Sequence, residues 1–354
     1  MIKKKNFIFL VLILMLLSLN SCLFNNNNDN SNNDDKREIT DMADRKVEVP
    51  KEIDKIFSIL PSGSMFIYSI DPDLLVGWNY GFNDNEKAYI LEDYLNLPTY
   101  GQGWEKVNKE AIIAAKPDII LAYGELIESE KNYADEFSSS TGLPVVMVDG
   151  SLSKAPEAYR FMGNLIGKTE KTESLAQYAE LALQYAENIK NNQTTNDTIY
   201  YGDGPNSFKT AGIGDVRAEL FDLLGANNVA DLETNGTVDD ERIIAWNPSI
   251  VILNGEPKGD NPKTPIEAVN DFKEKYTSVD AVKNNRVYGI PKYPFSWFDR
   301  PQSTNRLIGI YWLADIIYPD LEIDIEEKAI EFYQLFYHID LTDEDLKIIL
   351  YLNE

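Results

Sequence analysis

Two stretches of the chain that begin 131 residues apart share one pattern, and this repeat is the feature that most constrains the fold. The first reads NKEAIIAAKPDIILAYGE (residues 108–125), and the second reads DDERIIAWNPSIVILNGE (residues 239–256). Each combines a short helical pattern, a proline and an apolar run that ends in Gly-Glu. A helix that leads through a turn into a buried strand is a unit of alternating α/β folds. The repeat predicts two lobes of like construction, and chance similarity of two helix–strand units is the alternative.

Short apolar runs bounded by Pro and Gly predict buried parallel strands in both halves of the chain. They are DKIFSIL, KPDIILAY and LPVVMVDG in the first half, and DTIYYG, NPSIVILNG and NRVYGIP in the second. Helices are expected between them, including residues 85–95 and 108–115. Residues 169–192 carry an apolar stripe at helical spacing. We therefore expect an α/β protein with two Rossmann-like lobes, joined by one long α-helix, and a ligand cleft between the lobes.

The first 22 residues, MIKKKNFIFLVLILMLLSLNSC, have the form of a secretory signal, with three lysines followed by an apolar run. The run is short for a membrane span, and no positive charges follow it. The Leu-x-small-Cys ending resembles a bacterial lipoprotein signal, which would be cleaved before Cys22 so that this thiol carries lipid. An ordinary signal peptide and an uncleaved anchor are the alternatives.

The composition of the remaining chain suggests where the folded parts begin and end. Residues 24–38 are almost wholly polar and cannot form a core. The predicted organisation is a lipoprotein signal peptide, a disordered tether, an N-terminal α/β lobe, a bridging helix and a C-terminal α/β lobe with closing helices. Their expected bounds are residues 1–21, 22–38, 39–168, 169–192 and 193–354.

Residue counts exclude several kinds of chemistry. Cys22 is the only cysteine and His338 is the only histidine. The mature chain therefore has no disulfide, no Cys-ligated metal site and no His-rich zinc site. No G-x-S-x-G motif or P-loop is present, so no nucleophile–base pair points to an enzyme. Paired carboxylates for glycoside hydrolysis are not excluded, but no motif indicates them, and we predict no cofactor and no resident metal.

The charge of the chain bears on its partners rather than on its ligand. The net charge is −25, which disfavours binding to nucleic acid and to anionic lipid head groups. An acidic surface suits a protein partner with basic patches. We expect contact with a membrane through the lipid anchor only.

Candidate ligand-binding residues follow the predicted strands, because ligands of open parallel α/β sheets bind beyond the carboxyl ends of strands. These residues are chosen by position, since none belongs to a ligand-specific motif. They are Ser62, Ser64, Trp78, Tyr80, Trp104, Tyr201, Arg217, Tyr293, Phe295, Trp297 and Arg300.

Two of these groups have a structural alternative. Ser62 and Ser64 begin a helical segment and can bind an anionic group, or they can simply cap that helix. KYPFSWFDRPQ (residues 292–302) is rich in aromatic rings. These rings can form a wall for a large planar chelate while Arg300 binds an anion. Alternatively, the rings pack on their own lobe and Asp299 pairs with Arg300.

Taken in order, these features resemble the solute receptors of ABC importers, in the class with a rigid helical backbone. ITDMADRKVEVPKEIDKIFSI (residues 39–59) is similar to the family's opening hairpin and first strand. PFSWFDRPQSTNRLIGIYWLADIIYP (residues 294–319) is similar to a branch of iron-complex receptors. The two repeat segments resemble the Pro-containing helix-to-strand segment of each lobe.

The resemblance implies an extracytoplasmic receptor that binds an iron chelate (siderophore or haem) or a corrinoid. It would deliver this cargo to an ABC permease dimer with its ATPase. Such a receptor is lipid-anchored on the outer face of the cytoplasmic membrane or lies in the periplasm. The same scaffold also serves molybdate or tungstate, which would use Ser62, Ser64 and Arg300 around a small anion. An adhesin or assembly protein that has kept the fold is a third possibility.

The resemblance also implies a docking role for Glu110 and Glu241, which occupy equivalent places in the two repeat segments. In the family, one acidic residue of each lobe binds a basic pocket of the paired permease subunits. Two like sites on a pseudo-symmetric receptor match a two-fold partner. The alternative is an ordinary exposed glutamate at the start of each helix.

Overall fold

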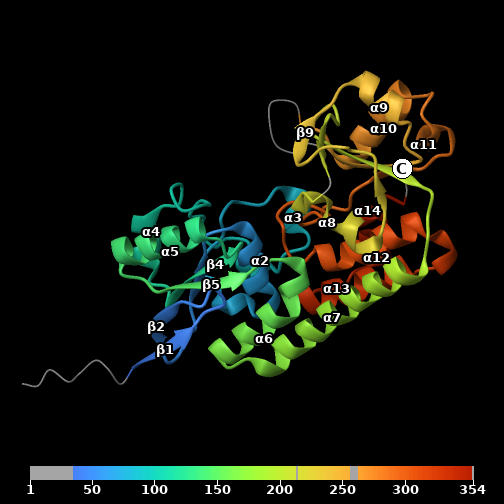
Figure 1. Ribbon diagram of the computed structural model, residues 1–354. Coiled ribbons are helices and arrows are strands. Elements are labelled where there is room, and N and C mark those ends of the chain that lie inside the picture. The colour runs from blue at the N-terminus through green and yellow to red at the C-terminus, as the bar shows by residue number, and fades with distance from the viewer. Residues whose placement is uncertain (1–34, 213, 256–261, 353–354) are drawn as a thin grey trace, which may run out of the picture.

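The computed structural model describes residues 35–212, 214–255 and 262–352, and these form two α/β lobes above a layer of helices (Figure 1). The predicted signal peptide, Cys22 with its lipid and residues 22–34 of the tether lie outside the described residues. Residues 36–38, which we expected in the tether, belong instead to strand β1 (Lys36–Thr40). Strand β1 pairs antiparallel with β2 (Lys46–Pro50), and this pairing orders the segment. Across the described ranges, no helix combines the length and the apolar character needed to cross a membrane.

The first lobe is built on three parallel strands in the order β3-β4-β5. Strand β4 lies in the centre, and nearly all residues of the three strands are buried because helices cover the sheet. The strands are β3 (Ile56–Ser58), β4 (Ile119–Gly124) and β5 (Val145–Asp149). The helices are α2 (Pro61–Ile70), α3 (Asp84–Lys87), α4 (Lys109–Ala115), α5 (Glu128–Thr141) and α6 (Ala155–Ile166).

The prediction of a helix at residues 85–95 is wrong. The structure has only the one-turn helix α3 there, followed by a 3-10 turn at Glu92–Tyr94. The backbone N–H of Leu91 donates to the hydroxyl of Tyr68 at 3.0 Å, so it is not available for a helical hydrogen bond. A tertiary contact therefore overrides the local helical pattern.

The second lobe repeats this arrangement and extends it. Strands β6, β10 and β11 are parallel with β10 in the centre, and β7 and β9 continue the sheet in antiparallel pairing. The strands are β6 (Thr198–Asp203), β7 (Lys209–Ala211), β8 (Asn227–Asn228), β9 (Asn235–Thr237), β10 (Ile250–Gly255) and β11 (Val287–Gly289). The helices are α8 (Glu219–Leu224), α9 (Asp240–Trp246), α10 (Pro265–Lys275) and α11 (Asp280–Lys283).

The sequence repeat corresponds to two equivalent structural units, which confirms the prediction of two like lobes. Helices α4 and α9 each have seven residues, and a side chain caps each start, from Asn108 and from Asp239. Both helices end in a left-handed residue, Lys116 with φ 52° and Asn247 with φ 44°. A proline and a buried six-residue strand follow in each case, β4 in one lobe and β10 in the other.

One continuous helix, α7 (Thr169–Asn192), connects the lobes with the bounds that the sequence predicts. It contacts α6 on the side of the first lobe and α8 and α12 on the side of the second. In Figure 1 it runs along the base of the molecule beneath both lobes. Its buried face carries many small side chains, and Ala176, Ala179, Ala182 and Ala186 are all fully buried. Small side chains let the neighbouring helices approach α7 closely.

The C-terminal helices contact both lobes. They are α12 (Arg306–Ile317), α13 (Ile325–Phe336) and α14 (Asp343–Ile349), and α13 contacts α2 of the first lobe. His338 Nε2 lies 2.9 Å from the carbonyl oxygen of Tyr68, and Lys171 Nζ donates to the carbonyl of Leu335 at 2.6 Å. The end of the chain thus ties the second lobe to the first.

This junction predicts a pH dependence of stability. Burial lowers the pKa of His338, and Lys171 lowers it further, while the hydrogen bond to Tyr68 and the charge of Asp71 oppose the shift. Histidine in the unfolded chain has a pKa of about 6.5. As the pH falls below that value, the unfolded chain binds a proton before the folded chain does. The stabilisation is therefore complete above that pH and is lost as the pH falls through the folded pKa. Urea unfolding of wild type and His338→Asn tests this. The free energy of unfolding should fall more steeply between pH 7.5 and 5 in wild type than in the variant.

Asparagine suits the left-handed backbone of residue 338, which has φ 61°. The other titrating groups are the same in both proteins, so their contributions cancel in the comparison. Parallel pH profiles for the two proteins would contradict this account of His338.

Candidate functional site

The carboxyl ends of strands from both lobes face one cavity of about 1140 Å³. The first lobe contributes the loop after β3, the start of α2, and the segment that contains α3. The second lobe contributes the ends of β6 and β10, the start of α10, and the segment after β11. The lining residues are Leu60, Pro61, Ser62, Tyr80, Asn83, Asp84, Asn85, Glu86, Gln102, Asp203, Asn254, Gly255, Pro262, Lys263, Thr264, Pro265, Glu267, Lys292, Tyr293, Pro294, Phe295, Ser296, Arg300, Pro301 and Gln302.

Aromatic rings from both lobes meet on one side of this cavity. We call Tyr80, Tyr293 and Phe295 the aromatic wall. The ring of Phe295 lies edge-on to Tyr80 at 6.5 Å, and the ring of Tyr293 stacks on Tyr89 at 6.2 Å between centroids. Burial raises the pKa of Tyr80 well above its usual value, and the charge of Glu86 adds to the shift. Tyr80 therefore stays a neutral phenol at physiological pH, suited to stacking and hydrogen bonding.

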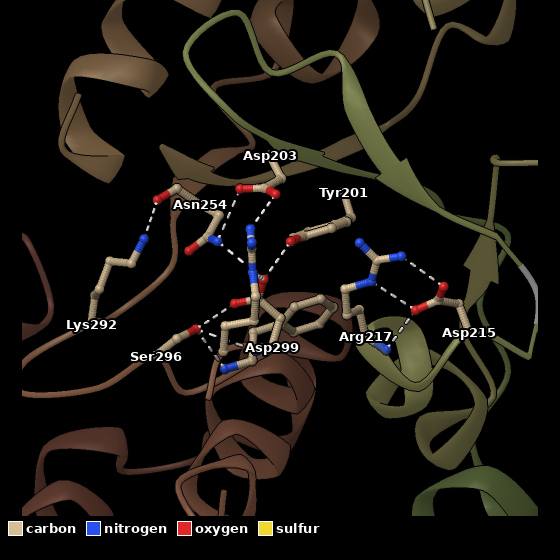
Figure 2. Close-up of polar contacts among 10 residues, drawn as sticks. Tyr201, Asp203, Asp215, Arg217, Asn254, Lys292, Ser296 and Asp299 are labelled. Carbon is tan, nitrogen blue, oxygen red and sulfur yellow. Dashed lines mark hydrogen bonds and ion pairs between the residues drawn. The ribbon is translucent and has the colours of Figure 1, made fainter. Parts of the chain in front are cut away.

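An ionic cluster lies beside the aromatic wall, and Figure 2 shows Asp203, Asn254 and Asp299 converging there. We define the ionic cluster as these three residues with Arg300. The Asn254 amide Nδ2 donates to Asp203 Oδ1 at 3.2 Å and to Asp299 Oδ2 at 3.1 Å. Arg300 Nη2 donates to Asp203 Oδ2, and Arg300 Nε donates to Asp299 Oδ2 at 3.3 Å. One guanidinium and one amide thus hold two buried carboxylates together.

Two hydroxyl groups complete the hydrogen bonding of Asp299. The Tyr201 hydroxyl donates to Asp299 Oδ2 at 2.6 Å, and Ser296 Oγ donates to Asp299 Oδ1 at 2.9 Å. Burial raises the pKa of Tyr201 well above its usual value, and the charges of Asp299 and Asp203 raise it further. The phenol therefore remains a donor, and Tyr201 lies beneath the cavity as a support for the ionic cluster.

The sequence left open whether Arg300 binds a ligand or pairs with Asp299. The structure contains the predicted ion pair between Asp299 and Arg300. Arg300 also pairs with Asp203, and its side chain remains 52% exposed where it lines the cavity. Its Nε and Nη2 groups therefore donate to carboxylates, and only its remaining N–H groups can donate to a ligand.

Five of the eleven predicted ligand residues line the cavity: Ser62, Tyr80, Tyr293, Phe295 and Arg300. The alternative role of Ser62 and Ser64 as caps is wrong, because Leu60 is the cap residue of α2 and no side-chain cap bond forms. Ser64 is buried instead, where its hydroxyl donates to Asn79 Oδ1 at 2.7 Å.

The structure places the two predicted tryptophans of the first lobe away from the cavity. Trp78 is buried in the core, and its indole N–H donates to the carbonyl of Tyr94 at 2.8 Å. Trp104 stacks on Tyr133 at 6.4 Å, and its indole N–H donates to Glu130 at 2.7 Å. Both rings already have packing and hydrogen-bond partners within the lobe, so neither contributes to the cavity surface.

Three predicted residues of the second lobe also lie outside the cavity lining. Tyr201 is buried beneath the ionic cluster, as described above. Arg217 forms an ion pair with Asp215 at 2.9 Å, which Figure 2 shows apart from that cluster. Trp297 is fully buried, with its indole N–H 3.4 Å from the Tyr333 hydroxyl, so its ring is part of the core.

Asp203, Asn254 and Lys292 line the cavity although they are not among the eleven candidate residues. Asp203 and Asn254 lie at the ends of β6 and β10, so their position after buried strands was the available signal. Lys292 Nζ donates to the carbonyl of Asn254 at 2.7 Å. Among the described residues, no hydrogen-bond partner reaches the buried Oδ1 of Asn254.

Glu110 and Glu241 are exposed in the first turns of α4 and α9, at equivalent positions in the two lobes. Within residues 35–212, 214–255 and 262–352, no group of three or more His, Cys, Asp or Glu side chains is placed to hold a metal ion.

The ionic cluster predicts a specific loss of stability. Arg300→Met removes the cation that lies between two buried carboxylates and leaves them facing each other. Breaking a buried pair costs about 3–5 kcal/mol, and the exposure of Arg300 reduces the expected cost to roughly 2 kcal/mol. Denaturant unfolding should show this decrease in the free energy of unfolding.

The matched control is Arg300→Met combined with Asp203→Asn. This second change removes one of the two facing negative charges and should recover part of the lost stability. Equal stability of wild type and Arg300→Met would show that the ionic cluster does not depend on the guanidinium.

Comparison with known proteins identifies the family. The family model for periplasmic binding proteins matches residues 82–294. The molybdate-binding protein MolA of Haemophilus influenzae is 23% identical over 337 residues, which cover 85% of this chain and 91% of MolA. The vitamin B12-binding protein of Salmonella paratyphi A is 28% identical over 162 residues, which cover 43% of this chain and 57% of that protein.

A solved structure extends this similarity over both lobes. An ABC transporter solute-binding protein from Sulfurospirillum deleyianum superimposes with a TM-score of 0.78 at 28% identity, over 89% of this chain and 99% of that one. The chain therefore belongs to the periplasmic binding protein family, whose members are solute receptors of ABC importers rather than enzymes.

Proposed function

We propose that this receptor binds an iron chelate, either a siderophore complex or haem, or a corrinoid. The observation that carries the proposal is the size of the cavity together with its aromatic wall. Ligand sites commonly measure about 300–1,000 Å³, and this cavity of about 1140 Å³ exceeds that range. A tetrahedral oxyanion would fill only a small part of it, whereas a large amphipathic chelate would contact rings from both lobes.

Two cations of the cavity can contact acidic groups of a ligand, and the carboxylates Asp84, Glu86, Asp203 and Glu267 line the same cavity. Lys292 and Arg300 both line the cavity on the side of the second lobe. A chelate with carboxylate or catecholate oxygens can place apolar surface on the aromatic wall and negative groups near these two cations. We propose that Tyr80, whose ring meets Phe295 edge-on in the aromatic wall, contacts the organic part of the ligand.

Molybdate or tungstate is the second candidate, and one observation favours it. Ser62 and the start of α2 line the cavity, and a helix start attracts anions. The similarity to MolA, whose name describes molybdate binding, points the same way. Against it, Arg300 is already bonded to two carboxylates, which leaves less of its fork for a small anion. We therefore rank the chelate first.

We also propose that Glu110 and Glu241 dock the receptor onto the permease dimer. Their support is the equivalent exposed position of the two side chains on α4 and α9. Two like acidic sites suit two like basic sites on a two-fold partner. The lipoprotein form of the N-terminal sequence supports a lipid anchor at Cys22, which would hold the receptor on the outer face of the cytoplasmic membrane or in the periplasm.

Native mass spectrometry with an absorbance spectrum tests the ligand class. The folded protein without Cys22, purified from its own host, is expected to carry an adduct of chelate mass with visible absorbance. A small colourless adduct with the mass of a metal oxyanion would contradict this and support the second candidate. Titration of emptied protein with haem, ferric siderophores, cyanocobalamin and molybdate then gives affinities for each class.

The aromatic wall predicts the effect of a substitution at Tyr293. Tyr293→Ala removes a ring that stacks on Tyr89 and borders the cavity, so the Kd for the chelate should rise about tenfold. Trp104→Ala is the control, because it removes a larger ring that lies outside the cavity. An equal loss of affinity in both variants would show that the wall is not a binding surface.

A further inference from the structure

The repeat places an exposed isoleucine on each helix that carries a proposed docking glutamate. Ile113 on α4 is 43% exposed, and Ile244 on α9 is 49% exposed. The residues directly before them, Ile112 and Ile243, are fully buried. Among the exposed large apolar side chains of the described residues, this is the one pair separated by the 131 residues of the repeat.

Each isoleucine shares a helix face with the glutamate. Residues three and four positions apart on a helix are neighbours on its surface. Glu110, Ile113 and Ala114 therefore form one face of α4, and all three are exposed. Glu241, Ile244 and Ala245 form the same face of α9 and are exposed as well. We call these two surfaces the paired faces.

The paired faces lie one on each lobe. Helices α4 and α9 lead directly into β4 and β10, so each helix begins near the carboxyl edge of its sheet. The N–H of Asn108, which caps α4, donates to Tyr100 at 2.7 Å, and that loop bonds back to Ile59 just after β3. Figure 1 shows α4 and α9 in different lobes and both away from α7. A partner that contacts both faces must therefore span the two lobes.

The fold itself does not require an isoleucine at these two positions. A β-branched side chain loses rotamer freedom in a helix, and alanine or a long polar residue is the better helix former on a solvent face. Neither Ile113 nor Ile244 belongs to the cores that hold Ile112 and Ile243. One exposed isoleucine is ordinary. Two at equivalent positions, each beside an exposed glutamate, indicate a shared partner.

We infer that Ile113 and Ile244 are the apolar anchors of the permease-docking surface. Each would enter an apolar socket on one permease subunit, next to a basic side chain that pairs with Glu110 or Glu241. This inference rests on the proposed docking role and adds the component that determines how long the complex lasts. A few side chains in well-packed, desolvated pockets at the centre of an interface supply most of the binding energy, whereas rim charges affect the association rate.

Binding kinetics with the receptor's own permease–ATPase complex in lipid nanodiscs test the inference. The variants are Ile113→Ala/Ile244→Ala and Glu110→Gln/Glu241→Gln. The matched control is Ile330→Ala/Ile348→Ala, because these isoleucines are 39% and 45% exposed on α13 and α14. Ile113→Ala/Ile244→Ala should raise Kd tenfold or more, mainly through faster dissociation, and should leave the salt dependence of binding unchanged. The glutamate pair should slow association and flatten the salt dependence, and the control pair should stay within about twofold of wild type.

The outcomes separate the anchors from the docking role itself. If only the glutamate pair weakens binding, docking by the acidic residues stands and the apolar anchors are wrong. If wild type does not bind the complex, or if all variants bind alike, the docking role is wrong and the inference fails with it. Circular dichroism and thermal unfolding check that each variant folds, which we expect because every substituted side chain is exposed.

Discussion

The packing of α7 is the constraint on which the rest of the structure depends. Its buried alanines let α6, α8 and α12 approach closely, so one rigid helix fixes the two lobes at their base. The contact of α13 with α2 adds a second connection between the lobes. With the base fixed in two places, the carboxyl ends of the two parallel sheets face each other, and the cavity between them is a consequence of that arrangement.

The segment after β11 gives this cavity its chemistry by combining two roles. Tyr293 and Phe295 face rings of the first lobe, while Trp297 and Phe298 are buried in the core. The ends of β6 and β10 then bind the same segment through Asp203, Asn254 and Asp299, with Arg300 as the shared cation. Packing on one side and ionic pairing on the other hold the wall of the cavity in place.

The internal repeat also links the fold to a partner. Equivalent helices precede the central strand of each lobe, so the exposed glutamate and isoleucine of the repeat occur twice, once on each lobe. The burial pattern of residues 110–120 and 241–251 is nearly identical position by position. A pseudo-symmetric receptor can therefore present two like surfaces to a two-fold partner without forming a dimer itself.

The sequence by itself determined the two-lobe α/β fold and the bounds of α7, because periodicity and the repeat are local signals. It also singled out Tyr80, Tyr293 and Phe295, which the structure places in the cavity lining. It did not reveal that residues 85–95 leave the helical path, since the hydroxyl of Tyr68 supplies a partner from elsewhere in the chain. Nor did it determine which strand-end side chains turn outward. Trp297 and Tyr201 are buried while Arg300 is exposed, and only the packing of the segment after β11 against β6, β10 and α13 decides that.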